Sequence, residues 1–459
     1  MISAISRKWA EWKAGVVHAT LNPQGQGAAR LHLVPPKFSL FGKPPHMLFI
    51  NGWHTVPLGP SWAVLLRTFL TELTQRARED VELQDCEIKA ILNAVTEKMA
   101  RIYPSVSRER FTRDLDEIIA IVIAIARGEQ MPAAMKSTMT LADYAPQMTA
   151  PHRMDLIVAP MTRNGVWACP LHCRNCYAAG QPAMKNVREL STFEWKDVID
   201  RCRTIGIPQL SFTGGEPLTR PDIVELVDHA RWHVTRLNTS GVNLSPGLAN
   251  ELKAASLDAI QITLYSDRAD IHDKLVGKEG AWAKTIEAIS HAVRAGLCVS
   301  VNTPLTRANA DYASMLHVLY SMGITFVSCS GLIWAGAAQA NMGNGESLTS
   351  DELYAVLQKA MVTATNLGME VSFTSPGWLN SEHLRKLGLA TPICGACLSN
   401  MAIAPDGSVV PCQSWLNGQG LGNILNMPWR HIWNSPACKR IRKQAALKPD
   451  CPLKEEVVR

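Results

Sequence analysis

Residues 169–176 read Cys169-Pro-Leu-His-Cys173-Arg-Asn-Cys176 and bring three thiols into one short stretch. Thiolates spaced three and then two residues apart can bind three corners of an iron–sulfur cubane and leave the fourth iron without a protein ligand. A structural zinc site usually closes with four protein ligands. His172 can complete such a zinc site, and buried structural cysteines are a further alternative. The spacing favours a cluster with one open iron.

The sequence on both sides of this stretch alternates between strand and helix patterns. Six strands are predicted, at 155–159, 209–213, 236–238, 259–265, 298–303 and 325–330. Helices are predicted between them at 192–205, 222–233, 247–255, 282–295 and 311–322, and a longer helix follows at 350–367. Six βα units in a row predict a parallel sheet that right-handed crossovers curl into a barrel or partial barrel. The functional site of such a fold lies at the carboxyl ends of the strands.

A second motif ends the second predicted strand, where residues 211–217 read Ser-Phe-Thr-Gly-Gly-Glu-Pro. Gly214 and Gly215 allow a ligand to approach the backbone closely, and Pro217 stiffens the exit from the turn. The carboxylate of Glu216 is an acceptor for an ammonium group. The motif therefore predicts a ligand site beside the cysteine stretch.

Together the two motifs resemble those of the radical S-adenosylmethionine (SAM) superfamily. The cysteine triple matches the superfamily's Cys-x3-Cys-x2-Cys motif, and 214–217 match the Gly-Gly-Glu-Pro motif that holds the SAM amino group. The resemblance implies an α/β fold with a partial (β/α)6 barrel and a [4Fe-4S] cluster at Cys169, Cys173 and Cys176. It also implies that SAM binds the open iron and is cleaved reductively to a 5′-deoxyadenosyl radical, which abstracts a hydrogen atom from the substrate.

Further candidate cofactor contacts follow from weaker similarities to the same superfamily. Ser240 follows the third predicted strand, where the superfamily often has Thr-Asn-Gly, and Thr263 lies in the fourth strand. Residues 272–277 resemble a His-Asp-x-x-Arg-Gly signature in which Val276 replaces the arginine. That arginine often pairs with a carboxylate, so Lys274 is the alternative candidate for this role.

Five more cysteines lie late in the chain, at Cys394, Cys397, Cys412, Cys438 and Cys451. A Cys-x2-Cys pair followed by a cysteine on a predicted Asp406-Gly407 hairpin suits a second metal site, and a zinc knuckle is an alternative. Cys397, Gly407 and Cys412 resemble the Cys-x9-Gly-x4-Cys element of SPASM/twitch domains. The resemblance implies at least one auxiliary [4Fe-4S] cluster, with Cys438 or Cys451 as the fourth ligand.

The remaining cysteines are assigned individually. Cys329 ends the sixth predicted strand and is a candidate hydrogen-atom donor to a substrate radical, with a buried core thiol as the alternative. Cys86, Cys202 and Cys298 are expected in the core, because small free cysteines are usually buried.

Residues 1–145 precede the barrel pattern and lack a cysteine cluster. A hairpin is predicted around Asn51-Gly52, followed by helices at 61–73, 87–102 and 108–126, and 130–148 resembles a linker. The segment weakly resembles the winged-helix-like peptide-recognition module of enzymes that modify ribosomally made peptides. Such a module binds a leader peptide by adding a strand to its sheet. A solubilising or dimerisation domain is the alternative.

Composition excludes several other classes of protein. Hydrophobic residues make up 47% and charged residues 19%, which allows sizeable cores and argues against disorder. The net charge of +6 is spread along the chain, so no nucleic-acid partner is expected. The apolar run at 118–126 is too short to span a bilayer, and the first residues lack a signal-peptide pattern. We therefore expect a cytoplasmic protein with no membrane partner.

These expectations combine into one functional hypothesis. The chain is divided into a peptide-recognition module (1–145), a radical SAM barrel (146–345) and a bridging helix with a SPASM/twitch domain (346–459). It is predicted to install a crosslink, a thioether or an epimerised centre in a precursor peptide, with flavodoxin or ferredoxin as electron donor. A radical SAM enzyme acting on a small molecule and a non-catalytic iron–sulfur or zinc regulator are the alternatives. A regulator would not need the Gly-Gly-Glu-Pro motif.

Overall fold

The computed structural model describes residues 16–21, 29–36, 45–51, 54–76, 83–126, 145–341, 344–374, 379–447 and 451. The chain forms two compact units, Met1–Thr149 and Ala150–Arg459. Most of the expected linker at 130–148 lies outside the described residues. None of the described helices has both the length and the apolar character needed to cross a bilayer.

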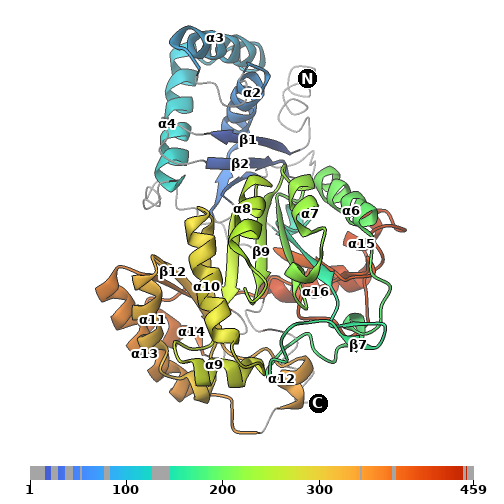
Figure 1. The fold of residues 1–459 in the computed structure, drawn as a ribbon. Coiled ribbons are helices and arrows are strands. Elements are labelled where there is room, and N and C mark those ends of the chain that lie inside the picture. Colours follow the sequence, from blue (N-terminus) through green and yellow to red (C-terminus); the bar gives the residue numbers. More distant parts are fainter. Residues whose placement is uncertain are drawn as a thin grey trace. The chain divides into compact units, whose positions relative to one another are not determined.

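In its described residues, the first unit joins a four-stranded antiparallel sheet to three helices (Figure 1). Its strands are β1 (Val17–Leu21), β2 (Ala29–Val34), β3 (His46–Ile50) and β4 (His54–Leu58), paired in that order, and its helices are α2 (Pro60–Arg76), α3 (Asp85–Ile102) and α4 (Arg108–Ala126). Leu31, Leu48 and Ile50 from the sheet share one core with Leu66 and Val95 from the helices. The predicted hairpin and three helices are confirmed, although Gly52 of the turn lies outside the described residues. Strands β1 and β2 were not predicted.

The second unit contains a nine-stranded sheet that includes all six predicted strands. Its strands are β5 (Arg153–Ala159), β8 (Gln209–Gly214), β9 (Val234–Thr239), β10 (Ala259–Thr263), β11 (Cys298–Pro304), β12 (Phe326–Ser330), β13 (Glu370–Thr374), β14 (Asn400–Ile403) and β15 (Val409–Val410). The order is β13-β12-β11-β10-β9-β8-β5-β14-β15, and all neighbours are parallel except the β14–β15 hairpin. Because β13 and β15 are the edges of this order, the barrel is partial, as predicted.

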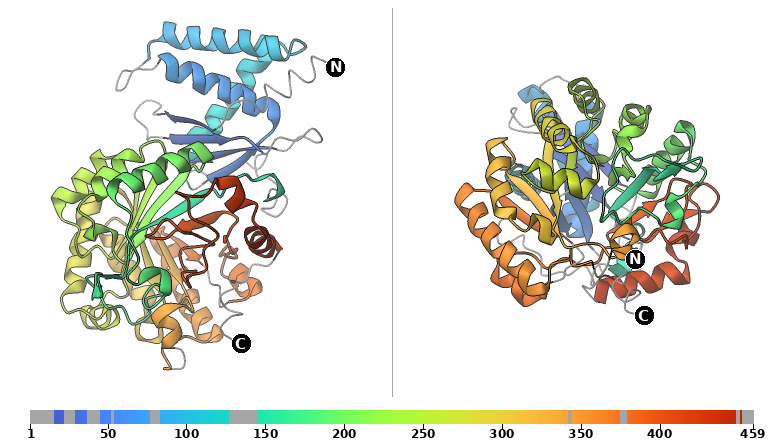
Figure 2. Two further views of the ribbon diagram at one scale, coloured as in Figure 1. Left: turned by 90° about the vertical axis from the view of Figure 1, so that its right-hand side faces the viewer. Right: turned by 60° about the horizontal axis from the view of Figure 1, so that its bottom comes forward.

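Helices cover the outer face of this curved sheet (Figure 2). These are α6 (Thr192–Ile205), α7 (Ile223–His229), α8 (Pro246–Ala254), α10 (Ala281–Arg294), α11 (Tyr312–Ser321) and α13 (Ser350–Leu367). The other described helices of this unit are α9 (Ala269–Val276), α12 (Gly336–Ala340), α14 (Ser381–Lys386), α15 (Trp429–Trp433) and α16 (Pro436–Leu447). Ser191 and Glu194 form the predicted capping box of α6. A small hairpin, β6 (Thr162–Arg163) and β7 (Val166–Trp167), connects β5 to the first cysteine stretch, so Cys169 does not follow β5 directly.

The inner face of the barrel is polar, whereas the interior of a closed (β/α)8 barrel is filled mainly by branched apolar side chains. Gln261 of β10 donates a hydrogen bond to Ser328 of β12 at 3.2 Å, and Ser328 donates to Asn302 of β11 at 2.9 Å. Side chains alternate between the two faces of a strand, so Cys329 points away from Ser328 and toward the helices. This polar inner face surrounds the candidate site.

Candidate active site

A cavity of about 530 Å³ lies at the carboxyl ends of the barrel strands. The predicted site residues that line it are Cys169, Cys173, Cys176, Gly214, Gly215, Glu216, Ser240, Thr263, Cys394, Cys412 and Cys451. The two cysteine groups, more than two hundred residues apart in the chain, therefore border one space. Pro217, Cys397, Cys438 and Cys329 do not line it.

The first cysteine stretch is held on one side by the C-terminal end of α9 and by Gly277 after it. The backbone amides of His172 and Arg174 donate to the carbonyls of Val276 and Leu275, both at 2.9 Å. A Cβ added to Gly277, which has φ +68°, would lie 2.6 Å from the His172 carbonyl oxygen. The 272–277 signature thus supports the cluster loop through its backbone, and the Val276 side chain is buried.

The lysine considered for the cofactor carboxylate does not reach the cavity. Lys274 is exposed on α9 and is absent from the lining. Its side chain is on the solvent side of the helix, while its buried neighbours Leu275 and Val276 face the cluster loop. The structure therefore does not support Lys274 as a carboxylate partner.

The other side of the cysteine stretch is held by residues around α12. The amide of Ala337 donates to the Cys176 carbonyl at 2.9 Å, and Asn341 donates to the Arg174 carbonyl at 2.6 Å. Glu346 forms an ion pair with Arg174 at 2.5 Å and accepts a hydrogen bond from Asn175 at 3.1 Å. The sequence analysis missed this support, because these contacts span more than 160 residues.

The chemistry of the three thiols fits an iron–sulfur cluster. Burial raises the pKa of Cys169 to about 12 and also raises the pKa values of Cys173 and Cys176. These thiols would be protonated at neutral pH unless bound metal stabilised the thiolates. Among the described residues, no three ligating side chains converge closely enough to hold a single metal ion. His172, the residue considered for a zinc site, is stacked on Trp167 with ring centroids 4.8 Å apart.

Glu216 is fixed by four hydrogen-bond donors. Oε1 accepts from the Thr239 hydroxyl at 2.6 Å and from the Leu218 amide at 3.1 Å. Oε2 accepts from the Ser240 hydroxyl at 2.6 Å and from the Ser240 amide at 2.9 Å. The carboxylate borders the cavity although the residue is only 1% exposed. It is therefore preorganised to meet an ammonium group, such as that of SAM.

The two glycines of the motif are required by contacts within the protein. A Cβ on Gly215 would lie 2.7 Å from the Pro160 carbonyl oxygen, and one on Gly214, which has φ +146°, would collide with Ala159. From the sequence, a ligand was expected in the space beside the two glycines. In the structure, the backbone at the end of β5 occupies that space. The packing brings the Gly215 carbonyl within 3.5 Å of the Cys169 thiol, which donates to it.

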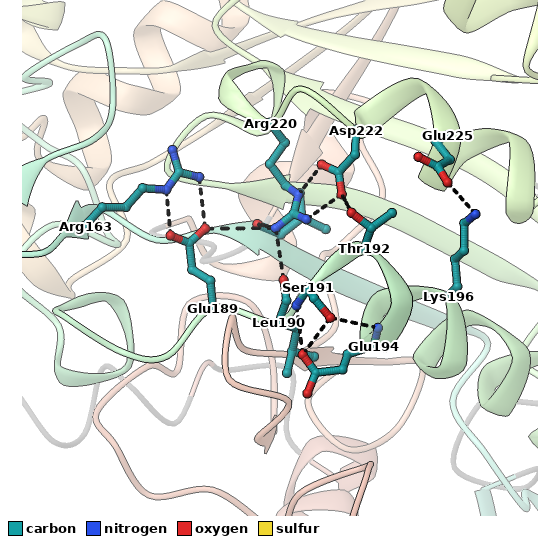
Figure 3. A network of polar contacts seen from close by, with 11 residues as sticks. Arg163, Glu189, Leu190, Ser191, Thr192, Glu194, Lys196, Arg220, Asp222 and Glu225 are labelled. Carbon is teal, nitrogen blue, oxygen red and sulfur yellow. Dashed lines mark hydrogen bonds and ion pairs between the residues drawn. The ribbon is translucent and has the colours of Figure 1, made fainter.

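Arg220 anchors the turn that follows the motif (Figure 3). Its guanidinium donates to the Val158 carbonyl at 3.1 Å and to both carboxylate oxygens of Asp222, at 2.8 and 2.6 Å. Glu189 lies 4.0 Å away and is paired with Arg163 through hydrogen bonds of 2.6 and 3.0 Å. Sequence reasoning missed this residue, although an arginine and an aspartate so close to the glycine motif were a usable signal.

All five late cysteines gather in the structure. The Cys394 thiol hydrogen-bonds Cys451, and the Cys397 thiol hydrogen-bonds Cys438. Cys412 lies close enough to Cys394 and Cys397 to affect their titration, and burial raises its own pKa to about 12. Arg442 donates to the Cys438 sulfur at 3.5 Å. A set of five neighbouring thiols, of which those of Cys394, Cys397 and Cys438 are buried, fits an auxiliary iron–sulfur cluster.

The structure corrects three predictions for the isolated cysteines. Cys329 is fully buried and hydrogen-bonds Tyr312 of α11, on the outer face of β12. A hydrogen-atom donor must face the cavity, so Cys329 loses the geometric basis for that role. Cys86 and Cys298 are exposed instead of in the core, while Cys202 is buried as predicted.

Several polar side chains that line the cavity were not predicted. They are Arg153, Arg236, Asn238, Gln261 and Asn302, all from the inner face of the barrel strands. Their signal in the sequence was the presence of polar residues at every second position of the predicted strands.

Comparisons with known families agree with this geometry. The profile of the Radical SAM superfamily matches residues 168–312, and that of the SPASM iron–sulfur cluster-binding domain matches residues 394–453. The chain is 28% identical over 277 residues to a PqqA peptide cyclase of Ruegeria pomeroyi, covering 59% of this chain and 70% of that protein. A PqqA peptide cyclase of Streptomyces rochei is 27% identical over 272 residues, covering 58% and 72%.

Solved structures show the same fold at low sequence identity. SuiB of Streptococcus suis, bound to its precursor peptide SuiA, has a TM-score of 0.59 at 13% identity, covering 91% of this chain and 96% of SuiB. The protein anSMEcpe with bound AdoMet has a TM-score of 0.52 at 17% identity, covering 64% and 84%. The two profile matches, together with the cavity that joins their residues, show that this chain contains a radical SAM domain followed by a SPASM iron–sulfur cluster-binding domain.

Proposed function

We propose that this enzyme uses SAM to modify a ribosomally made precursor peptide. The observation that carries the proposal is the single cavity bordered by the Cys169 triple, Glu216 and the late cysteines. A substrate in that cavity is in reach of both metal sites. Two relatives are named PqqA peptide cyclases, and SuiB is described with a precursor peptide, which supports a peptide as substrate.

The first site would be built from residues that the geometry has already grouped. Cys169, Cys173 and Cys176 would bind the [4Fe-4S] cluster, and Glu216 with Ser240 would hold the SAM ammonium. The Gly214–Pro217 turn and Thr263 would border the bound cofactor. When bound, the cluster and SAM supply a 5′-deoxyadenosyl radical. The protein's part is to orient the cofactor and substrate and to exclude water from the cavity.

The late cysteines would bind an auxiliary [4Fe-4S] cluster that takes up an electron from the substrate or binds it. Cys394, Cys412 and Cys451 border the cavity, and Cys397 with Cys438 lies behind them. A cluster bound by four thiolates leaves one of the five late cysteines without an iron ligand role. Formation of a crosslink removes two hydrogen atoms, one through SAM and the other as a proton and an electron, and the auxiliary site is the acceptor for that electron.

The first unit would recognise the peptide. Its sheet order leaves β1 and β4 at the edges, and an edge strand can pair with an extended peptide through main-chain hydrogen bonds. Flavodoxin or ferredoxin would supply electrons. The chain has twelve cysteines, eight of them in the two proposed cluster sites, and such a set suits a reducing compartment, which supports the cytoplasm as the location.

The first experiment measures 5′-deoxyadenosine formation by anaerobically reconstituted protein supplied with SAM and a strong reductant. A triple Cys169→Ala, Cys173→Ala, Cys176→Ala variant serves as the control and is expected to form none. Co-expression with small peptides encoded beside the gene then tests the substrate by mass spectrometry. Loss of two hydrogen atoms indicates a crosslink or thioether. A peptide whose mass is unchanged in ordinary water but rises by one deuterium-for-hydrogen exchange in heavy water indicates epimerisation. SAM cleavage with no peptide modified would favour a small-molecule substrate.

A further inference from the structure

Two arginines face the cavity on the inner side of the barrel. Arg153 begins β5, and Arg236 lies within β9, two strands away in the sheet order. Strand register pairs Asp155 with Ser211 of β8 and Ser211 with Arg236, so these residues form one layer across three strands. Both arginines line the cavity. Asp155 does not line it and is fully buried.

Positively charged side chains outnumber negatively charged ones in this layer. Arg153 pairs with Asp155 through Nε to Oδ1 at 2.9 Å and Nη2 to Oδ2 at 3.4 Å. Burial and the positive charge of Arg153 lower the pKa of Arg236 to about 10, and Asp155 acts in the opposite direction. Arg236 is nevertheless protonated at neutral pH. The two guanidinium groups repel each other, and a carboxylate bound in the cavity beside them would relieve this repulsion.

The layer is separate from the place where the SAM ammonium is expected. Among the described residues that line the cavity, Glu216 is the only one with a carboxylate. Glu216 is held by Ser240, which lies about 13 Å along β9 from Arg236 at the usual rise per residue. The two arginines are therefore free of competition from Glu216 for an anionic ligand.

A neighbouring amide adds hydrogen-bonding capacity to the same face. Asn238 follows Arg236 by two residues on β9, so both side chains point inward. Both residues line the cavity. The Oδ1 atom of Asn238 is buried and has no hydrogen-bond partner among the described residues. An amide oxygen accepts hydrogen bonds, so a buried Oδ1 without a partner calls for an N–H or O–H donor from a ligand or water and not for a carboxylate.

From this arrangement we propose that Arg153 and Arg236 form a carboxylate-binding subsite for the substrate, and that Asn238 Oδ1 beside them accepts a hydrogen bond from an N–H of the same ligand. The subsite holds an acidic group at the inner end of the cavity, while the hydrogen to be abstracted lies toward Glu216 and Ser240. The identification of the ligand as part of a peptide rests on the proposed function. The carboxylate can then belong to an aspartate or glutamate side chain or to the peptide's C-terminus.

Binding of small neutral and charged probes to the reconstituted holoenzyme tests the subsite without turnover. N-acetylglutamate methylamide is compared with its glutamine analogue, and N-acetylalanine with its methylamide, by NMR titration at fixed ionic strength. In the wild type, at least one carboxylate probe is expected to bind about tenfold more tightly than its neutral analogue. The glutamate pair reports on a side-chain carboxylate, and the alanine pair on a C-terminal one.

Substitutions assign the preference to the two arginines. Arg153→Gln combined with Arg236→Gln is expected to reduce it to less than about threefold, while Arg153→Lys with Arg236→Lys retains part of it. Arg231→Gln is the matched control, because Arg231 precedes β9 and pairs with Asp228 at 2.7 Å outside the cavity. Iron content and SAM affinity verify that each variant is folded.

Two results would overturn the subsite. One is equal binding of charged and neutral probes by a wild-type enzyme that binds SAM, and the other is a preference unchanged in the double glutamine variant. Neither result bears on peptide modification, which is scored separately by peptide mass. If the enzyme modifies none of the peptides tested, the probe titration still shows whether the two arginines bind a carboxylate.

Discussion

The Ser240 hydroxyl donates a hydrogen bond of 2.6 Å to Oε2 of Glu216, across 24 residues of sequence. Glu216 follows β8 and Ser240 follows β9, which are neighbouring parallel strands. Parallel strands present their carboxyl ends on the same edge, so two residues from separate motifs meet there. The contact fixes the Glu216 carboxylate before any cofactor arrives.

Replacement of Glu216 is expected to weaken SAM binding. Glu216→Gln keeps the shape but removes the charge opposite the ammonium, so the Kd for SAM should rise at least about tenfold. Ser240→Ala should have a smaller effect, since the Ser240 amide and Thr239 hydroxyl still hold the carboxylate. Anaerobic equilibrium dialysis measures both values. An unchanged Kd in Glu216→Gln would remove Glu216 from the cofactor site.

The packing of Gly277 against the cluster loop predicts a loss of iron when a methyl group is added. Gly277→Ala forces a Cβ to within 2.6 Å of the His172 carbonyl and must displace the loop. Gly280→Ala is the matched control, because Gly280 also has positive φ, +73°, but has no neighbour within 4 Å of the added Cβ. Both variants carry the backbone cost of alanine at positive φ, about 1 kcal/mol.

Iron analysis and electron paramagnetic resonance of the reconstituted variants compare the two glycines. Gly277→Ala should lose occupancy at the first cluster, and Gly280→Ala should retain it. Equal occupancy in both variants would show that the loop adjusts to the methyl group at no cost to the cluster.

Arg220 should matter for stability and for cofactor binding together. Arg220→Ala removes the buried guanidinium, leaves the partly buried Asp222 with the Thr192 hydroxyl as donor and frees the Val158 carbonyl, at a cost of about 2 kcal/mol. The melting temperature of the reconstituted enzyme should fall by several degrees, and the Kd for SAM should rise as the Glu216 turn loosens.

A surface ion pair provides the comparison for Arg220. Arg188 lies 2.6 Å from Glu194 but is 69% exposed, so Arg188→Ala should cost less than about 1 kcal/mol. Arg220→Lys should recover little, because lysine cannot reproduce the paired contacts to Asp222. Equal melting temperatures for Arg220→Ala and Arg188→Ala would contradict the anchoring role.

Removal of Cys412 should affect the auxiliary site alone. Cys412→Ser is expected to lose the iron of one cluster, roughly half of the total if each site holds one [4Fe-4S] cluster, while 5′-deoxyadenosine formation persists. Cys298→Ser, at an exposed cysteine that does not line the cavity, should retain all iron. Full iron content in Cys412→Ser would exclude Cys412 as a ligand.

The sequence by itself determined the cluster motif, the glycine motif and the order of strands and helices. These features are local, because cysteine spacing and hydrophobic periodicity can be read from a few consecutive residues. The capping box of α6 and the extent of α13 were likewise predictable, since both depend on residues within one or two helical turns. Strands β1 and β2 were missed because such short strands carry a weak periodic signal.

Tertiary structure alone decided which face each strand turns toward the cavity. The alternation of side chains along a strand predicts two faces but does not say which face is the inner one. For that reason Cys329 was placed at the cavity, and Arg153 and Arg236 were overlooked. The gathering of five late cysteines and the contacts of Arg220 also depend on segments far apart in sequence meeting through sheet register. Motifs follow from spacing along the chain, whereas a site follows from the directions of side chains after strands have paired.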